Sequence, residues 1–239
     1  MDKHISLLDK GCERLGIKLT EDQLEQFNSY IQLLLSWNKK FNLTAIVEAE
    51  EIVIRHFLDS LTVLEPGLIR PDSSLIDIGA GAGFPSVPLK ILLPDLKVVL
   101  IDSVNKKVSF LNELIDKLAF KETQALHARA EDLAKEADMR ETFDFAVSRA
   151  VADLRVLFEY SLPFVRLGGY CIFNKGPTVE SELKAAQRAA SILGSDRPVA
   201  RQVLVPFSDR SHWLVTAKKI KNTANKYPRR AGIPKKDPL

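Results

Sequence analysis

Residues 75–89, LIDIGAGAGFPSVPL, decide the fold of this chain. The stretch opens with a short apolar run, Leu75, Ile76 and Ile78, which is typical of a buried parallel strand. Glycines then stand at alternate positions, and a helical segment follows. Because a glycine has no side chain to block a ligand, the backbone of such a turn can touch a cofactor. We therefore predict a strand, a ligand-binding turn and a helix.

The spacing of the glycines separates three kinds of nucleotide-binding turn. A dinucleotide fingerprint, G-x-G-x-x-G, would need a further glycine at either Phe84 or Ser86. A phosphate-binding P-loop would need Gly-Lys-Ser/Thr at its end, whereas Lys90 comes too late. What remains, D-x-G-x-G-x-G from Asp77, resembles motif I of class I S-adenosylmethionine (SAM) methyltransferases. A tight turn without a ligand is the alternative that the glycines alone leave open.

The next strands bring polar residues to the same edge of the predicted sheet. Residues 98–101 form a second strand that ends at Asp102, where a carboxylate can accept hydrogen bonds from both hydroxyls of a ribose. This feature fits SAM and NAD equally, and a carboxylate in a surface loop is its alternative. After a third strand at 123–127, Ala130 and Glu131 are expected beside the adenine, although they also suit a helix N-cap. A fourth strand at 143–148 is expected to aim Arg149 at the site.

Periodicity organises the rest of the chain. Apolar spacing predicts helices over 5–15, 20–37 and 48–64, and Thr20 with Gln23 forms a capping box for the second. A turn at Gly168 and Gly169 is predicted before a fifth strand at 170–174, and a hairpin of 202–205 with 213–217 follows. This order predicts an α/β class I SAM-dependent methyltransferase fold, with a seven-stranded, mostly parallel sheet whose last strand is antiparallel. We divide the compact unit into a helical N-terminal extension (1–67), a SAM-binding domain (68–219) and a basic tail (220–239).

One polar cluster precedes the glycine turn. Arg55, His56 and Asp59 share the third predicted helix. A lone histidine rarely signals a catalyst, so spacing alone favours a solvated helix face and a histidine whose hydrogen bonds are satisfied.

Composition favours a soluble, cytoplasmic protein. With 239 residues, 46% of them hydrophobic and 27% charged, the chain can bury a full core. Its two cysteines, Cys12 and Cys171, are far apart and lack C-x-x-C spacing, so neither a disulfide framework nor a metal site is expected. No signal segment and no run of about 18 apolar residues appears, which argues against export and membrane insertion.

Charge is unevenly distributed. Residues 218–239 carry eight basic residues and one acidic residue, a net charge of +7, whereas the preceding residues carry 26 basic and 30 acidic residues, a net charge of −4. A basic tail on an acidic body indicates a polyanionic partner, because each phosphate contact releases a counterion. A purely solubilising tail is the alternative.

Five stretches, taken together and in order, resemble a known family. They are WNKKFNLTAI from Trp37, HFLDSL from His56, DIGAGAGFPSVPL from Asp77, FDFAVSRAVADL from Phe143, and KYPRRAGIPKKDPL from Lys226. The chain is similar nearly end to end to the small-subunit (16S) ribosomal RNA guanine-N7 methyltransferases, once called glucose-inhibited division protein B. It departs at Ser86, where the family usually has glycine.

The resemblance implies SAM as the cofactor and small-subunit rRNA or a ribosomal subunit as the partner. With the residues inferred from the motifs, the expected cofactor contacts are Gly79, Gly81, Phe84, Asp102, Ala130, Glu131 and Arg149. Arg149 is also the candidate for positioning the reactants. The expected RNA contacts in the tail are Lys226, Arg229, Arg230, Lys235 and Lys236.

The residues that the chain lacks narrow the reaction. No Asn/Asp-Pro-Pro-Tyr/Phe follows the fourth strand, where methylases of base amino groups carry it, and no Pro-Cys nucleophile for pyrimidine C5 appears. Guanine N7 has an in-plane lone pair, so alignment of the reactants suffices and no general base is expected. A non-catalytic RNA-binding or ribosome-assembly factor is the main alternative, and an oxidoreductase is the third.

Overall fold

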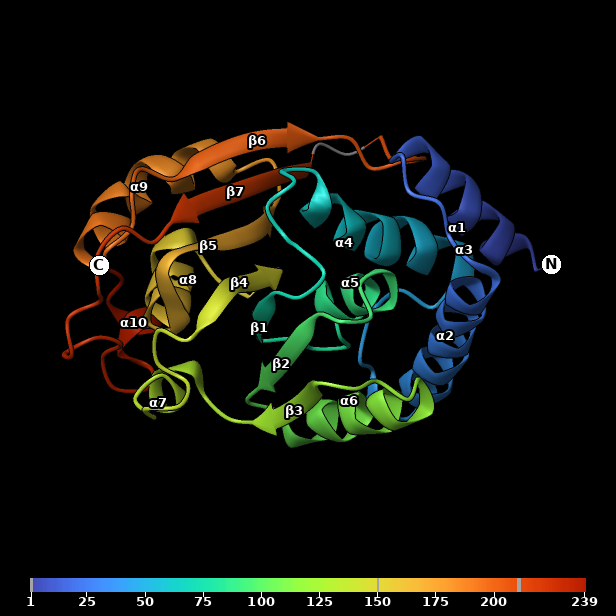
Figure 1. Ribbon diagram of the computed structural model, residues 1–239, viewed down its shortest axis with the longest axis horizontal. Helices are drawn as coiled ribbons and strands as arrows, with labels where there is room; N and C mark the ends of the chain where they lie inside the picture. The colour runs from blue at the N-terminus through green and yellow to red at the C-terminus, as the bar shows by residue number, and fades with distance from the viewer. Residues whose placement is uncertain (1, 150, 210–211) are drawn as a thin grey trace.

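A seven-stranded sheet runs through the middle of the protein (Figure 1). The computed structural model describes residues 2–149, 151–209 and 212–239. The strands lie in the order β3-β2-β1-β4-β5-β7-β6, and β7 runs antiparallel to both of its neighbours while the other pairs are parallel. This confirms the predicted mostly parallel sheet with an antiparallel last strand. The strands are β1 Ser74–Ile78, β2 Lys97–Asp102, β3 Thr123–His127, β4 Phe143–Arg149, β5 Val165–Lys175, β6 Val199–Val203 and β7 His212–Lys218.

Helices cover both faces of the sheet, and each face has its own apolar core. On one face lie the N-terminal helices with α5 and α6, and on the other lie α7 to α10 (Figure 1). No helix among the described residues is long and apolar enough to cross a membrane. The helices are α1 Lys3–Arg14, α2 Glu21–Phe41, α3 Ala49–Ile52, α4 Asp59–Leu61, α5 Ser86–Leu92, α6 Asn105–Lys117, α7 Ala130–Leu133, α8 Leu154–Ser161, α9 Val179–Ile192 and α10 Ile233–Lys236.

The three predicted N-terminal helices are confirmed, and the third is irregular. Thr20 and Gln23 form the expected capping box at the start of α2. The third helix is a succession of α3, the π-helical segment η1 (Val53–Leu58), α4 and the 3-10 turn η2 (Thr62–Leu64). π-helical segments are frequent at functional sites, and this one carries Arg55 and His56.

Two predictions about the later strands were wrong. Gly168 and Gly169 do not form a turn before β5 but lie within it, where a Cβ on Gly169 would stand 2.4 Å from the carbonyl oxygen of Asp144. Close approach of a neighbouring strand therefore explains that glycine. The first strand of the hairpin is β6, at 199–203 instead of 202–205. Beyond it Val205 leaves the sheet and is buried in the core of the N-terminal helices.

The basic tail folds back onto α8 and belongs to the compact unit. Tyr227 is buried, and the Arg140 guanidinium donates hydrogen bonds to the carbonyl oxygens of Tyr227 and Thr223. The Arg229 guanidinium donates to both carboxylate oxygens of Glu159, which is fully buried on α8. This pair fixes the tail, since the carboxylate has left water and needs its partner.

We predict that Arg229→Ala lowers the free energy of unfolding by about 2 to 3 kcal/mol, because it leaves the Glu159 carboxylate buried and unpaired. The neighbouring Arg230 is exposed, so Arg230→Ala is the matched control and should change stability by less than about 0.5 kcal/mol. Urea titration followed by circular dichroism measures both. Equal effects of the two substitutions would contradict a stabilising role for the pair.

Candidate functional site

The glycine turn follows β1 and is tied to β2 by backbone hydrogen bonds from Gly79 and Ala80 to the carbonyl oxygen of Ile101, at 2.9 and 3.0 Å. Gly79, Gly81 and Gly83 all have positive φ, but only Gly81 faces open space: a Cβ there would come no closer than 3.8 Å to any other atom. Gly81 therefore leaves its space free for a ligand.

Asp77 stabilises the glycine turn from inside the protein and does not line the site. Its side chain is fully buried, and the Ser86 hydroxyl donates to its Oδ2 at 2.6 Å. Burial raises the pKa of Asp77 to about 7, although the Ser86 hydrogen bonds oppose that rise. Ser86, the departure from the family pattern, thus supplies a hydrogen bond that glycine has no side chain to make.

Asp102 lies at the end of β2 with its carboxylate already oriented. Its Oδ2 accepts a hydrogen bond from Gly81 N at 3.0 Å, and its Oδ1 accepts one from Val104 N at 2.9 Å. Lys107 Nζ lies 3.5 Å from Oδ2. Because an ionised carboxylate has about four acceptor sites, Asp102 retains capacity for two hydroxyl donors.

A cavity of about 550 Å³, which we call the cofactor cavity, opens above these residues. All seven predicted cofactor residues line it: Gly79, Gly81, Phe84, Asp102, Ala130, Glu131 and Arg149. Ala150, quoted with Arg149 in the sequence pattern, is outside the described residues. No cluster of three or more His, Cys, Asp or Glu side chains suited to a metal ion occurs in the part of the chain that the structure describes.

The tail completes one wall of the cofactor cavity. Glu131 is buried, and its carboxylate accepts a hydrogen bond from Gly232 N at 3.0 Å. Burial, followed by the charge of Glu131, raises the pKa of Tyr160 to about 12, so the phenol stays neutral. Lys235, which is also expected to contact RNA, is exposed and lines this cavity.

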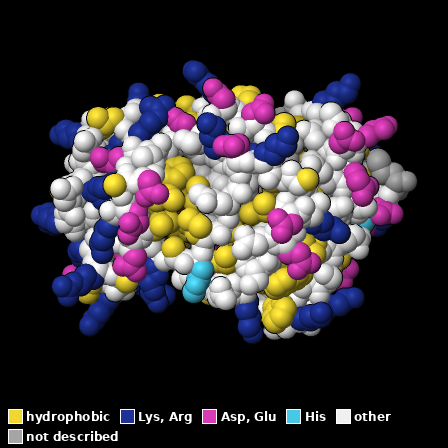
Figure 2. Space-filling view, turned by 60° about the horizontal axis from the view of Figure 1, so that its bottom comes forward, with side chains coloured by type: hydrophobic (Ala, Val, Ile, Leu, Met, Phe, Trp, Pro, Cys, Tyr) yellow, Lys and Arg dark blue, Asp and Glu magenta, His cyan; other side chains and the backbone are white. Residues whose placement is uncertain are grey.

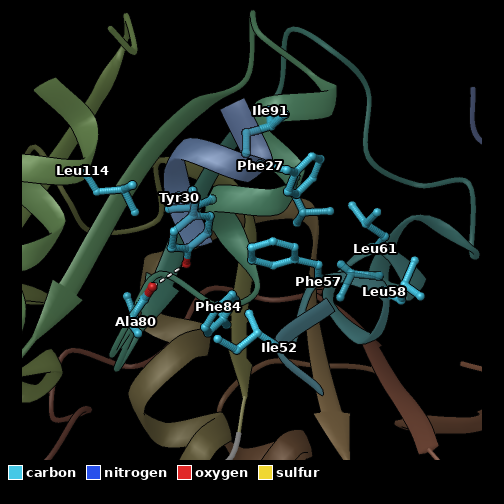
Figure 3. Close-up of a cluster of buried hydrophobic side chains, with 14 of the residues drawn as sticks. Phe27, Tyr30, Ile52, Phe57, Leu58, Leu61, Ala80, Phe84, Ile91 and Leu114 are labelled. Atoms are coloured by element: carbon cyan, nitrogen blue, oxygen red, sulfur yellow. Dashed lines mark hydrogen bonds between the residues drawn. The ribbon is translucent and has the colours of Figure 1, made fainter. Parts of the chain in front are cut away.

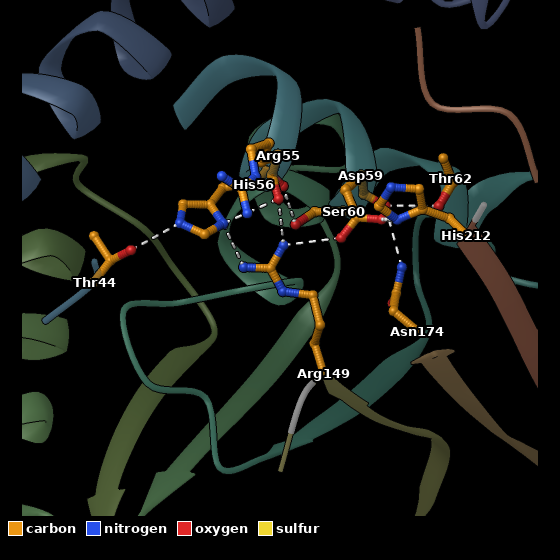
Figure 4. A network of polar contacts seen from close by, with 9 residues as sticks. All are labelled: Thr44, Arg55, His56, Asp59, Ser60, Thr62, Arg149, Asn174 and His212. Atoms are coloured by element: carbon orange, nitrogen blue, oxygen red, sulfur yellow. Dashed lines mark hydrogen bonds and ion pairs between the residues drawn. The ribbon is translucent and has the colours of Figure 1, made fainter. Parts of the chain in front are cut away.

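Arg149 links the sheet to the N-terminal helices (Figure 4). Its Nη1 donates to Asp59 Oδ2 and to the Arg55 carbonyl oxygen, both at 3.0 Å, and its Nη2 donates to His56 Nδ1 at 2.8 Å. Its guanidinium also lies over the Phe84 ring, 4.8 Å from the centroid. The predicted solvated helix face is therefore wrong for Asp59, which is buried.

His56 is a satisfied histidine, as spacing predicted. Burial and then the charge of Arg149 lower its pKa to about 3, so the ring is neutral. His56 Nδ1 lies 2.8 Å from Arg149 Nη2 and 3.0 Å from the Arg55 carbonyl oxygen, and His56 Nε2 lies 3.0 Å from Thr44 Oγ1. Both ring nitrogens therefore already have polar partners within the protein.

Tyr30 contacts the glycine turn from the N-terminal helices, which the sequence pattern did not predict. Tyr30, on α2, is fully buried and donates its hydroxyl to the carbonyl oxygen of Ala82. Its ring stacks on Phe84, with 5.4 Å between centroids, so the N-terminal helices pack directly against the turn (Figure 3). The one available signal was a tyrosine inside an otherwise apolar helical stripe, since a buried hydroxyl needs a partner.

The remaining tail cations lie at the surface. Lys226, Arg230 and Lys236 are exposed. Lys and Arg side chains gather on the end of the molecule that carries α10 and the tail, at the left of Figure 2, and others lie at the opposite end. Four of the five predicted RNA cations are thus exposed, Lys235 among them at the rim of the cofactor cavity, and Arg229 is held in an ion pair.

Comparisons with known proteins point to one family and one fold. The model of the family described as rRNA small subunit methyltransferase G matches residues 23–204. A protein of that name from Alkaliphilus metalliredigens is 45% identical over 98% of this chain and 98% of its own. One from Thermoanaerobacter sp. (strain X514) is 47% identical over 100% of this chain and 99% of its own. The solved structure of a SAM-dependent O-methyltransferase from Thermotoga maritima matches with a TM-score of 0.53 and 15% identity, over 79% of this chain and 72% of its own, and supports the fold.

We predict that Gly81→Ala weakens binding of SAM at least about tenfold, because the methyl group enters the cofactor cavity. Positive φ at an alanine also costs about 1 kcal/mol of stability. Gly67 is the matched control, since it has φ of +68° against +60° and nothing within 4 Å of its Cβ position. Calorimetric titration should therefore show weakened binding for Gly81→Ala and parent affinity for Gly67→Ala. Unchanged affinity in Gly81→Ala would remove the turn from the binding site.

Proposed function

Because the chain belongs to the rRNA small subunit methyltransferase G family, we propose that it transfers the methyl group of SAM to N7 of a guanine in 16S ribosomal RNA. The observation that carries this proposal is the cofactor cavity at the carboxyl ends of the parallel strands, where open α/β sheets bind their ligands. Family membership favours an enzyme over the non-catalytic RNA-binding factor.

The residues of the cofactor cavity fit SAM. Gly81 leaves room beside the backbone, and Asp102 has acceptor sites for two ribose hydroxyls. Phe84, Ala130 and Glu131 are proposed to surround the rest of the cofactor. When bound, SAM supplies a methyl group that is attached to a sulfonium sulfur. The neutral thioether that leaves needs no protonation.

The transfer requires alignment more than acid or base chemistry. As the N7 lone pair forms the new N–C bond, the S–C bond breaks and its electron pair stays on sulfur. N7 carries no proton, so none has to be removed. This agrees with His56, whose ring is neutral and is held between Arg149 and Thr44. We propose that Arg149 positions the reactants, since a guanidinium cannot take a proton.

The atom that is methylated gives the decisive test. Small-subunit rRNA incubated with the protein and SAM should be cut at one guanosine after borohydride reduction and aniline treatment, which cleave at 7-methylguanosine. Omission of SAM should abolish the cut. Methyl incorporation without a cut would place the methyl group on another atom, and no incorporation into rRNA or small subunits would favour the non-catalytic factor.

We further propose that the exposed cations of the tail contact RNA phosphates in the cytoplasm, where ribosomes are found. Lys226, Arg230 and Lys236 are exposed, so their side chains can reach RNA phosphates. Arg229 should contribute less, because its guanidinium is held by Glu159. Lys235 is exposed as well and also lines the cofactor cavity, so it is proposed to contact RNA beside the cofactor.

The triple substitution of Lys226, Arg230 and Lys236 by alanine should weaken RNA binding and reduce the slope of log K against log salt by about 2. SAM affinity should be unchanged. A matched control removes Lys10, Lys18 and Lys97, which are also exposed but lie away from both the tail and the cofactor cavity. RNA binding is measured by filter retention at several salt concentrations for the parent and both triple variants. Equal slopes for the two variants would mean that the tail only aids solubility.

A further inference from the structure

A second cavity adjoins the cofactor cavity and has a volume of about 750 Å³. Its walls include His56, Asp59, Arg149, Asn174, Lys175 and His212. His56 and Arg149 line both cavities, so these two side chains mark the boundary between them. The second cavity lies at the ends of β4, β5 and the start of β7 (Figure 4).

Asn174 lines the second cavity and has a buried side-chain acceptor without a partner. The side chain is 7% exposed, and its Nδ2 donates to the backbone carbonyl oxygen of Asp59 at 3.2 Å. That carbonyl can only accept, so the amide nitrogen must face it and Oδ1 must point elsewhere. Among the described residues, Asn174 Oδ1 has no hydrogen-bond partner. Buried polar atoms are nearly always paired, so this oxygen calls for a donor from a ligand.

Lys175, Asp59 and Arg149, three charged residues that line the second cavity, each have an oppositely charged neighbour. Lys175 Nζ lies 2.6 Å from Glu182 Oε2 and donates to the carbonyl oxygen of Ala152. Asp59 faces Arg149 through Oδ2 and His212 through Oδ1, at 3.0 and 2.9 Å. Burial alone would raise the pKa of Asp59, but His212 and Arg149 outweigh it and hold the pKa below its usual value. The second cavity therefore combines a neutral acceptor, Asn174 Oδ1, with ion pairs whose charges cancel. Such a cavity suits a neutral base better than an anion.

Resting on the proposed function, we propose that the second cavity holds the acceptor guanine and that Asn174 Oδ1 accepts a hydrogen bond from its 2-amino group. N7 must face the cofactor cavity, across His56 and Arg149. The 2-amino group lies on the side of the purine opposite N7, so it points away from that boundary and into the second cavity, which Asn174 lines. Bases that undergo enzymatic chemistry leave their stack and are read by hydrogen bonds to the Watson–Crick edge.

This arrangement accounts for the preference for guanine over adenine and for the positive charge that methylation of N7 creates. Adenine lacks the 2-amino group and would leave Asn174 Oδ1 unpaired, which disfavours it. Alkylation of N7 places positive charge on the purine ring. Because Asp59 neutralises Arg149, that charge develops beside an ion pair and not beside an unpaired guanidinium. Asn174 is thus a specificity residue, and Asp59 positions it through the backbone carbonyl.

The test compares guanine with inosine, which keeps N7, O6 and N1–H and lacks only the 2-amino group. Small-subunit rRNA with inosine ligated at the methylated position is assayed with the parent protein and with Asn174→Ala. The parent should show about a tenfold lower kcat/KM on inosine than on guanine. Asn174→Ala should be about tenfold slower than the parent on guanine and should treat the two bases alike. Asn112→Ala, an exposed position on α6, is the matched control and should keep the parent preference.

The outcomes separate this inference from the proposed function. Asn174→Ala and the parent should bind SAM equally by calorimetry, which also shows that the variant is folded. If the parent methylates guanine and the inosine penalty persists in Asn174→Ala, or is absent in the parent, the assignment of Asn174 is overturned while the activity stands. If the parent methylates no rRNA, the proposed function itself fails.

Discussion

The Arg149 guanidinium joins the carboxyl end of β4 to the N-terminal helices through three donated hydrogen bonds. It also covers one side of the Phe84 ring. Phe84 in turn stacks on Tyr30 and on His56, so the glycine turn rests on side chains from α2 and η1. A change in the N-terminal helices therefore reaches the cofactor cavity directly. The helical extension is therefore part of the site, because it supplies Thr44 and His56 to the lining of the cofactor cavity.

The parts of the site that could be predicted from sequence are those fixed by short segments of the chain. The glycines, Asp102 and the exit of β3 each follow a strand, and parallel strands bring their carboxyl ends to one edge. That rule alone gathers all seven predicted cofactor residues around one cavity. Tyr30 and Asn174 could not be assigned in this way, because their roles depend on partners 52 and 115 residues away.

The net charge of residues 218–239 overstates how many of their cations are available to a partner. Lys219 is fully buried and lies 3.0 Å from Glu141 Oε1, and Arg229 is held by Glu159. Two of the eight cations thus stabilise the fold. The acidic partners come from distant segments, and a one-dimensional charge count carries no information about which pairs form. Similarly, Gly169 resembled a turn residue because a close strand contact and a turn favour the same amino acid.

The hydrogen bond between Gly232 N and the Glu131 carboxylate has a consequence for the order in which the protein matures. The two residues are 101 positions apart, and Lys235, on the same cavity, comes later still. At translation rates of about 5 to 20 residues per second, the wall of the cofactor cavity is finished about 5 to 20 s after Glu131 is made. A nascent chain that has already folded its first four strands therefore has an incomplete cavity.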